Sequence, residues 1–416
     1  MHYWIKQEVS ALLRLFNTLG KRIEIFRPVN KEVVNIFTCG PSVYQRAHIG
    51  NFRTFLFEDI LVRYLVYAGY DVKRGMNLTD IEDKTIKEAQ KQKTTVRRLA
   101  KINIKAFIRE MNLLRMKIPD YLPRASESVN EAVDLIERLL CRKIAYWHKG
   151  NVYFDPVKFR GFGKLYGLDM SKWPLKKRRF HKDTYPGTQW NLGDFILWHG
   201  CRKVNQYCWD TKIGGGRPAW NIQDPSMIGR YFDETLSVYC GGIDNLYRHH
   251  DYTLAILESV RPYPMAKYWL HCNHLYVAGQ KMSKSKGNIL YTDTLLKQGY
   301  GVAEIRFFLS YGHYRERINY SQKQMRLVGD KLRTFRSLVS GINRKASRKI
   351  NLRGKIVQII KKTFIKHMDN DLNVKGAFDG LFKVMSDINI GELKPDEAAG
   401  IIRTLKEIDE VLKVIF

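Results

Sequence analysis

The hydrophobic pattern changes period twice between residues 33 and 76. Asn35-Ile36-Phe37-Thr38 is expected to be a short strand after the polar turn at residues 30–32. From residue 47 to residue 68 the apolar side chains recur mostly every three or four positions, the helical period, and Gly69 follows as a stop. Residues 71–76 are expected to form a second strand. Such a strand–helix–strand crossover is almost always right-handed, so the pattern predicts a parallel sheet.

The remaining pattern separates an interrupted α/β region from a helical end. Residues 103–116 and 127–142 have the helical period, whereas 151–154, 190–198, 236–240 and 269–277 are strand-like. Residues 146–200 are rich in aromatic and basic side chains and are expected to be an insertion. From residue 321 to residue 416 the pattern is helical, with breaks expected near Gly341, Gly354, Gly391 and Pro395. We find no internal repeat.

Composition narrows the class of protein. No run approaches 18 consecutive apolar residues, so the sequence predicts no membrane-spanning segment. Residues 1–22 have a helical pattern without the compact apolar run of a secretory signal. Six cysteines in 416 residues do not make a disulfide framework. We therefore expect a protein of the reducing cytoplasm.

Charge points to a polyanionic partner. The chain holds 71 Lys and Arg against 41 Asp and Glu, a net charge of +30. Such an excess binds nucleic acid through counterion release. It is concentrated at residues 176–182 and at residues 326–366, where Asp330 is the one acidic residue. The alternative is that these runs are solvated faces in a chain with a general lysine and arginine bias.

Two short motifs carry candidate chemistry. Cys39 and His48 flank the turn between the first strand and its helix, where ligands bind in parallel α/β folds. His48-Ile49-Gly50-Asn51 opens the helix, so a glycine and helix amides can approach a phosphate. Lys281-Met282-Ser283-Lys284-Ser285 places two lysines among small hydroxyl residues, which suits a mobile loop that closes on a triphosphate. By itself this second string would be a solvated loop.

Together the two motifs resemble the HIGH and KMSKS signatures of class I aminoacyl-tRNA synthetases. Several further stretches, in order along the chain, resemble cysteinyl-tRNA synthetase: residues 38–44, 77–84, 216–220, 241–244, 249–250 and 310–315. The resemblance implies protein biosynthesis: ATP and Mg²⁺ activate an amino acid as its adenylate, which is transferred to tRNA. It implies an α/β fold, a Rossmann-type parallel-sheet catalytic domain with an insertion, followed by an all-α helical bundle.

The resemblance also divides the chain. It implies an N-terminal extension (1–29), the first half of the catalytic domain (30–145), a connective insertion (146–200), the second half with the KMSKS loop (201–290), a stem-contact region (291–325) and a helical bundle (326–416). The small anticodon-reading domain of many bacterial members is expected to be absent, and a monomer is expected.

Site residues follow from the matched motifs. The resemblance implies that His48, Asn51, Lys281 and Lys284 are catalytic. It implies an ATP site made of Gly40, His48, Gly50, Asn51, Gly241, Asp244, Lys281, Ser283, Lys284 and Ser285, with Asp244 near the ribose. The amino-acid pocket would be lined by Cys39, Thr79, Trp220 and His249.

The family's metal site is altered in this chain. In the family, four ligands hold a zinc ion that binds the substrate's thiolate and so separates cysteine from serine. Cys39 and His249 match two ligands, but Asp224 stands at the second cysteine and Thr253 at the glutamate. Cys39, Asp224 and His249 could still hold zinc, with Cys240 or Asp251 as substitutes. The alternative is that the site has lost its metal and no longer selects a thiol.

Three hypotheses stay open at this point. The first is a divergent cysteinyl-tRNA synthetase. The second is a paralogue that passes an activated amino acid to a small-molecule amine. The third is a non-catalytic descendant that binds tRNA. The KMSKS loop argues against the third hypothesis, and the basic helical region favours tRNA over a small amine.

Overall fold

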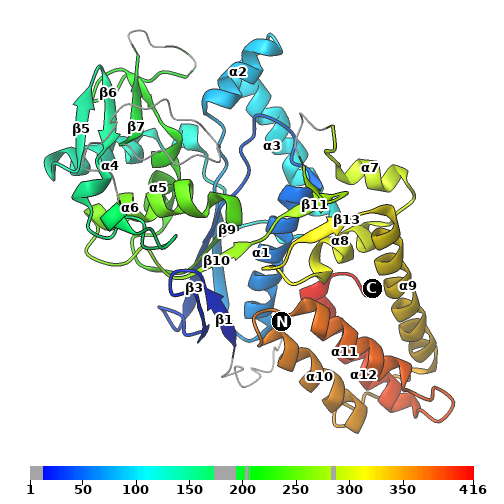
Figure 1. The fold of residues 1–416 in the computed structure, drawn as a ribbon. Coiled ribbons are helices and arrows are strands. Elements are labelled where there is room, and N and C mark those ends of the chain that lie inside the picture. Colours follow the sequence, from blue (N-terminus) through cyan, green and yellow to red (C-terminus); the bar gives the residue numbers. More distant parts are fainter. Residues whose placement is uncertain (1–12, 173–193, 202–204, 206, 283–286) are drawn as a thin grey trace.

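A four-stranded parallel sheet lies at the centre of the molecule (Figure 1). The computed structural model describes residues 13–172, 194–201, 205, 207–282 and 287–416. The strand order is β10-β9-β3-β4, with β3 at Val33–Thr38, β4 at Asp71–Met76, β9 at Leu236–Gly242 and β10 at Ala266–Cys272. Thr38 is in register with Met76 and with Cys240, so the carboxyl ends of three strands meet at one edge. The predicted parallel crossover is confirmed.

The two faces of the sheet pack against different layers. Ile36 and Val238 face α1 (Ile49–Tyr67) and the C-terminal helices, whereas Phe37 and Tyr239 face a second cluster. That second cluster includes α4 (Val129–Cys141), α5 (Trp220–Tyr231) and α6 (Asp251–Val260). The period-two alternation of a strand thus places successive side chains in separate cores.

The insertion is a small antiparallel sheet in the order β5-β6-β7-β8. Its strands are Ala145–His148, Asn151–Phe154, Phe195–Gly200 and Gly216–Pro218, so the sheet continues past residue 200. It packs beside α4–α6, at the upper left of Figure 1. Among the described residues, Cys201 and Cys208 form a disulfide next to this sheet. The basic run at 176–182 lies outside the described residues.

The helical expectation for residues 1–22 is wrong where the structure describes them. Arg14–Asn17 (β1) and Arg22–Ile25 (β2) form an antiparallel hairpin. The turn between them includes Lys21 with a positive φ of 50°. Leu13 and Leu15 are buried against the sheet, and the Thr18 amide donates to the Trp269 carbonyl at 2.8 Å. Tertiary pairing with β10 therefore overrides the local helical period.

Further helices and strands complete the part of the molecule around the carboxyl edge of the sheet. They are α2 (Asp83–Lys91), α3 (Val96–Leu113), α7 (Thr292–Lys297), α8 (Val302–Tyr311), and the strands β11 (Leu275–Val277), β12 (Gln280–Lys281) and β13 (Ile318–Tyr320). The buried guanidinium of Arg53 on α1 donates to the carbonyls of Leu309, Gly312, His313 and Glu316. The segment after α8 is therefore fixed to the helix that starts at His48.

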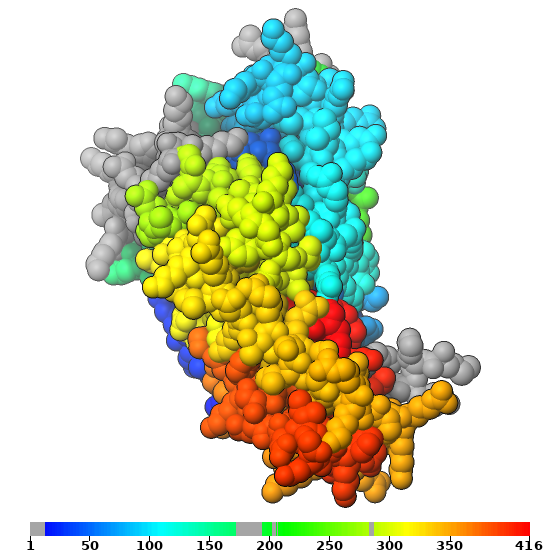
Figure 2. All heavy atoms as spheres, turned by 90° about the vertical axis from the view of Figure 1, so that its right-hand side faces the viewer, coloured from blue at the N-terminus to red at the C-terminus, as the bar shows by residue number. Residues whose placement is uncertain are grey.

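Four helices form the C-terminal end, gold to red in Figure 2. They are α9 (Gln322–Lys345), α10 (Lys355–Met368), α11 (Val374–Ser386) and α12 (Pro395–Leu412). The break expected near Gly341 is wrong, because α9 continues through it. A Cβ at this position would lie 3.1 Å from the Ile390 side chain, so the glycine permits close approach of the loop between α11 and α12. Packing thus offsets its low helix propensity.

The helical end is attached to the catalytic sheet by polar contacts as well as by the shared core. Asp371 accepts hydrogen bonds from the Phe16 amide of β1 at 2.9 Å and from the Tyr314 hydroxyl at 2.7 Å. The Arg315 guanidinium also donates to this carboxylate at 2.7 Å. No described helix is long and apolar enough to cross a membrane.

Candidate active site

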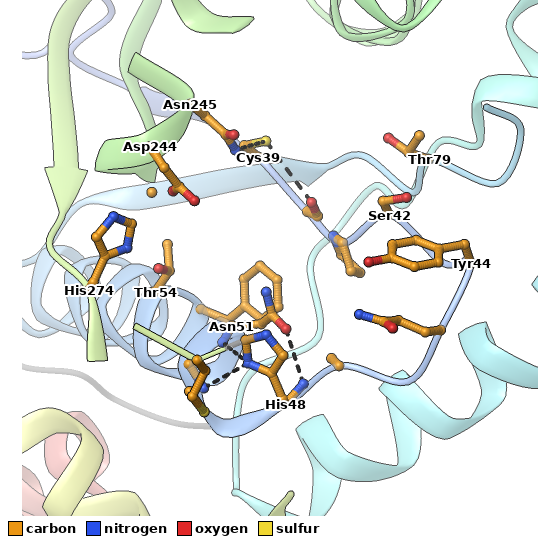
Figure 3. Close-up of a pocket in the computed structure, with 18 of the residues that line it drawn as sticks. Cys39, Ser42, Tyr44, His48, Asn51, Thr54, Thr79, Asp244, Asn245 and His274 are labelled. Carbon is orange, nitrogen blue, oxygen red and sulfur yellow. Dashed lines mark hydrogen bonds between the residues drawn. The ribbon is translucent and has the colours of Figure 1, made fainter. Parts of the chain in front are cut away.

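A pocket of about 510 Å³ opens at the carboxyl edge of the sheet (Figure 3). Its walls include ten of the residues expected from the sequence: Cys39, Gly40, His48, Gly50, Asn51, Thr79, Trp220, Asp244, His249 and Lys281. Gly241, Asp224 and Thr253 lie behind the wall. Ser283, Lys284 and Ser285 lie outside the described residues. One pocket thus joins the ends of β3, β4 and β9 with the start of α1 and with Lys281.

His48 caps α1 and has a defined tautomer. Its Nδ1 accepts hydrogen bonds from the backbone amides of Gly50 at 3.1 Å and Asn51 at 3.3 Å. The Asn51 Oδ1 accepts the His48 amide in return at 3.0 Å, which completes a capping box. Because Nδ1 accepts, the proton of the neutral ring is on Nε2. Burial lowers the pKa of His48 to about 4, so the ring is neutral near pH 7.

Two glycines permit close approaches around this cap. A Cβ on Gly50 would lie 2.5 Å from the Met282 side chain, so the glycine lets the loop after β12 pack on the start of α1. A Cβ on Gly40 would lie 1.9 Å from the Asn77 carbonyl oxygen. The Gly40 amide instead donates to Asn77 Oδ1 at 2.6 Å. The two signature motifs are therefore in direct contact with each other, and so are the residues that follow β3 and β4.

Lys281 and Asp244 form a solvated ion pair at the mouth of the pocket. Lys281 Nζ lies 3.3 Å from Asp244 Oδ2 and 3.4 Å from His274 Nε2. Their side chains are 53% and 49% exposed, so the pair is screened by water and is worth about 1 kcal/mol or less. A ligand with its own negative charge and hydroxyl groups can therefore separate the two side chains at small cost.

Cys39 is a buried residue of the pocket wall. It follows β3, and the Asn245 amide donates to its Sγ at 3.5 Å (Figure 3). Burial, followed by the negative charges of Asp224 and Glu58, raises the pKa of the Cys39 thiol. Without a cation beside it the sulfur is therefore protonated. The indole of Trp220 stacks on the His249 ring, with centroids 3.9 Å apart.

Asp224 is fully buried and is held by three donors. Its Oδ1 accepts from Asn77 Nδ2 at 2.8 Å. Its Oδ2 accepts from the Tyr239 hydroxyl and from His249 Nε2, both at 2.9 Å. The donors come from the end of β4, from β9 and from the π-helical turn Leu246–His250. The carboxylate therefore joins three side chains by hydrogen bonds and is not itself part of the pocket wall.

The four positions implied for zinc fit only in part. Both oxygens of Asp224 already accept hydrogen bonds. The Thr253 hydroxyl donates to the His249 carbonyl within the helix at 2.8 Å. Cys240 packs in the cluster on the α1 side of the sheet. Asp251 accepts from the Tyr166 amide at 3.2 Å, and burial raises its pKa to about 7. Each of these groups therefore has protein contacts other than Cys39.

A different set of donors does converge. Sulfur of Cys39 and one imidazole nitrogen each of His249 and His250 lie within 4.8 Å of one another, and all three residues are buried. Thiolate sulfur and imidazole nitrogen are both zinc donors, so these residues fit the metal that the resemblance implies. The sequence did contain the His249-His250 pair, but gave no reason to assign the second ring a role.

Other residues of the site were not predicted from the sequence. Asn77, Tyr239 and Asn245 each contact a predicted residue through a hydrogen bond. His271 contacts His250, which was also not predicted. Asn77 opens the motif at 77–84, and Tyr239 precedes the glycine-rich run, so position in a motif was the available signal. His271 lies on β10, and nothing in its local sequence marked it.

Comparison with protein families places these motifs in context. Residues 25–330 match the model for the tRNA synthetases class I (C) catalytic domain, and residues 363–416 match the DALR domain. A cysteine--tRNA ligase of Chlamydia muridarum is 33% identical over 421 residues, covering 97% of this chain and 88% of the relative. Cysteine--tRNA ligases of Solibacter usitatus and Koribacter versatilis are 34% and 35% identical, with 97% of this chain covered in each case.

Solved structures share the fold at low identity. A Mycobacterium tuberculosis methionyl-tRNA synthetase in complex with methionyl-adenylate matches with a TM-score of 0.62 at 14% identity, covering 92% of this chain and 90% of that one. A LeuRS–tRNA–LeuAMS ternary complex from Agrobacterium radiobacter K84 matches with a TM-score of 0.69 at 11% identity, covering 94% and 85%. Both matches support the class I synthetase architecture.

Proposed function

The chain belongs to the cysteine--tRNA ligase family of class I tRNA synthetases, and on this premise we propose that it activates cysteine with ATP–Mg²⁺ and charges tRNA. The observation that carries the proposal is the single pocket that joins the His48 helix cap, Lys281 and Cys39. Amino-acid activation and tRNA charging follow from the family. The choice of cysteine, the metal ions and the residue roles are the proposal.

The nucleotide end would bind ATP through groups that already line the pocket. His48 Nε2 carries a proton and donates to a phosphate oxygen, while the Asn51 amide nitrogen is left for a second donation because its oxygen serves the cap. Lys281 leaves Asp244 for the phosphates, and Asp244 then accepts from the ribose hydroxyls. Mg²⁺, when bound with ATP, would supply positive charge that offsets the charge of the phosphates.

The reaction needs positioning and charge stabilisation more than acid–base chemistry. A carboxylate oxygen of the amino acid attacks the α-phosphorus, the bond to the bridging oxygen breaks, and pyrophosphate leaves. Lys281, together with Lys284 from the sequence motif, stabilises the charge that develops on pyrophosphate. A terminal ribose hydroxyl of tRNA then attacks the adenylate's carbonyl carbon, and AMP leaves.

The side-chain end would select the amino acid. Thr79 and Trp220 line the walls there, with Cys39 and His249 at the base. A zinc ion in this end would supply a Lewis acid that prefers a thiolate to a hydroxyl. Cys39, whose thiolate form burial disfavours, would be deprotonated when it binds the metal.

Basic residues of the helical end favour tRNA over a small amine as the acceptor. Lys355, Lys362 and Lys366 lie on α10, are exposed, and share one helical face by their spacing. No side-chain ion pair is formed by these three lysines among the described residues. An unpaired basic face is suited to a phosphate backbone. We further propose that the enzyme acts as a monomer in the cytoplasm.

Pyrophosphate exchange over a panel of all amino acids tests the proposal. We expect Mg²⁺-dependent exchange with cysteine and little with serine, followed by cysteine transfer to unfractionated tRNA. Exchange without transfer to tRNA, but with transfer to a small amine, would make the chain a paralogue. Absence of exchange with every amino acid would overturn the enzyme assignment. Light scattering on the purified protein tests the monomer.

A further inference from the structure

Three buried side chains bring atoms that can bind a metal close to one another, and none of these side chains forms a hydrogen bond with another. We call Cys39, His249 and His250 the Cys39–His249–His250 cluster, whose donor atoms lie within 4.8 Å of each other. Cys39 follows β3, and the two histidines end the π-helical turn before α6. The residues therefore come together only because β3 and β9 are adjacent in the sheet.

His249 presents a bare lone pair. Its Nε2 lies 2.9 Å from Asp224 Oδ2, and a carboxylate can only accept, so the ring proton is on Nε2. Its Nδ1 is buried and has no hydrogen-bond partner among the described residues. An unpaired buried nitrogen costs about 1–3 kcal/mol. A histidine that donates one N–H to a carboxylate while its other nitrogen binds a metal is the common arrangement in zinc sites.

His250 is held in a parallel way. Its Nδ1 lies 2.8 Å from His271 Nε2, and His271 Nδ1 lies 2.9 Å from the Thr18 hydroxyl. His250 Nε2 is buried without a partner among the described residues. When the protons of this chain point outward to Thr18, Nε2 carries a bare lone pair. The hydrogen bond to His271 therefore fixes the orientation of the His250 ring.

Gly241 makes room for this ring beside the sulfur. A Cβ at Gly241 would lie 2.8 Å from His250 Nε2 and 3.1 Å from Cys39 Cβ. Only a glycine therefore allows His250 to approach Cys39. Gly241 is not in the pocket wall. Its contacts belong to this cluster.

We propose that Cys39 Sγ, His249 Nδ1 and His250 Nε2 bind one zinc ion, with a fourth position open to the substrate's thiolate. The inference rests on the proposed function and deepens it. It assigns His250 as a ligand and leaves Asp224 and Thr253, at the family's other two ligand positions, without a bond to the metal. Asp224 becomes a positioning residue that orients His249. Tetrahedral zinc needs donors roughly 3.4–3.6 Å apart, so a small closure of the cluster completes the site.

X-ray absorption of the zinc-loaded full-length protein tests the ligand set directly. We expect a first shell with one sulfur and two imidazoles, and a second sulfur after cysteine is added. A shell with one imidazole and a carboxylate in place of the other would overturn the proposal, because it would return Asp224 to the ligands. Failure of the protein to retain zinc after reconstitution would also overturn it.

Variants give a second, independent readout through metal content and the thiolate-to-cobalt charge-transfer band of the cobalt-substituted protein. His250→Ala should lose metal affinity by at least a hundredfold, and Thr253→Ala, at the family's fourth position, should retain it. Asp224→Asn should weaken affinity by about 10–100-fold and keep both imidazoles in the shell. ATP binding by each variant checks its folding. Unchanged metal affinity in His250→Ala would refute the assignment.

The inference and the proposed function can fail separately. Cysteine-dependent exchange that persists in metal-free protein would remove the cluster's role and leave the enzyme assignment intact. Zinc bound by the expected ligands, without exchange for any amino acid, would confirm the site and overturn the proposed function.

Discussion

The two ends of the pocket are built in different ways. At the nucleotide end, Lys281 and Asp244 are each about half exposed and form one solvated pair. At the side-chain end, Asp224 is fully buried and bonded to Asn77, Tyr239 and His249. Charges in water can exchange partners at little cost, whereas charges in a dry interior cannot. One end is thus suited to change partners during a reaction, and the other to hold a fixed shape.

The same contrast explains where the chain departs from its family. The nucleotide end keeps the residues that the resemblance implies, with Asn51 in place of a histidine and still part of the cap. The side-chain end departs from the resemblance at Asp224 and Thr253, and the Tyr239 hydroxyl donates to Asp224. A buried carboxylate is tolerated when hydrogen-bond donors surround it. Asp224 meets this condition, because Asn77, Tyr239 and His249 all donate to it.

The largest effect is expected from Asp224→Leu. This substitution would leave the Asn77 amide, the Tyr239 hydroxyl and the His249 N–H buried without their acceptor. We expect the free energy of unfolding to fall by about 3–5 kcal/mol, measured by urea denaturation. Thr253→Val is the control, since it removes one helical hydrogen bond and should cost about 1 kcal/mol. Equal losses in the two variants would contradict the central role of Asp224.

Lys281→Ala should act on rate instead of stability. Loss of a charge that works in the transition state should slow adenylate formation by about a hundredfold, measured by pyrophosphate exchange. Its ion pair is solvated, so the urea midpoint should not change. Lys297→Ala, at an exposed lysine outside the pocket, is the control for exchange. If Lys281→Ala exchanged pyrophosphate as fast as wild type, Lys281 would have no role in the reaction, and the proposed difference between the two ends would be wrong.

A smaller effect is expected on the helical end. The double variant Lys362→Ala/Lys366→Ala removes two exposed lysines without ion pairs among the described residues. We expect tRNA affinity to fall several-fold and its salt slope to decrease by about 2, with unchanged pyrophosphate exchange. Lys331→Ala/Arg333→Ala changes the net charge equally, but removes residues paired with Asp379, Glu304 and Asp330. This control should weaken tRNA binding less. Equal losses would show that net charge alone decides binding.

The smallest effect concerns His48 and pH. Burial lowers its pKa from 6.5 to about 4 in the folded protein, whereas the unfolded chain takes up a proton near 6.5. The His48 contribution to stability should therefore be constant above pH 6.5 and decrease as pH falls from 6.5 to 4. Comparison of urea unfolding for wild type and His48→Asn should show wild type losing its relative stability over that range. A difference that is constant from pH 8 to pH 4 would contradict a buried neutral ring.

Local pattern determined much of the fold. The strand at 35–38, the helix after His48 and the strand at 71–76 were predicted because each has one clear period and a stop. The hairpin at Arg14–Ile25 was missed, since its strands are stabilised by contacts with β10 and not by their own pattern. The break at Gly341 was wrong for a related reason, because the packing of Ile390 is not visible in the local sequence.

The sequence by itself also predicted that residues around His48 and Lys281 belong to one site, and both line the same pocket, because they lie in two contiguous motifs. Only the tertiary structure decided the side-chain end. Asp224 matched a ligand position by alignment of motifs, yet its oxygens are already bonded to Asn77, Tyr239 and His249. His250 gained its place from Gly241, His271 and Thr18, which are distant in the chain. The residues of one motif are recognisable because their spacing in the sequence is fixed. Which nitrogen of a buried histidine is left to bind a metal depends instead on hydrogen-bond partners that only folding brings together.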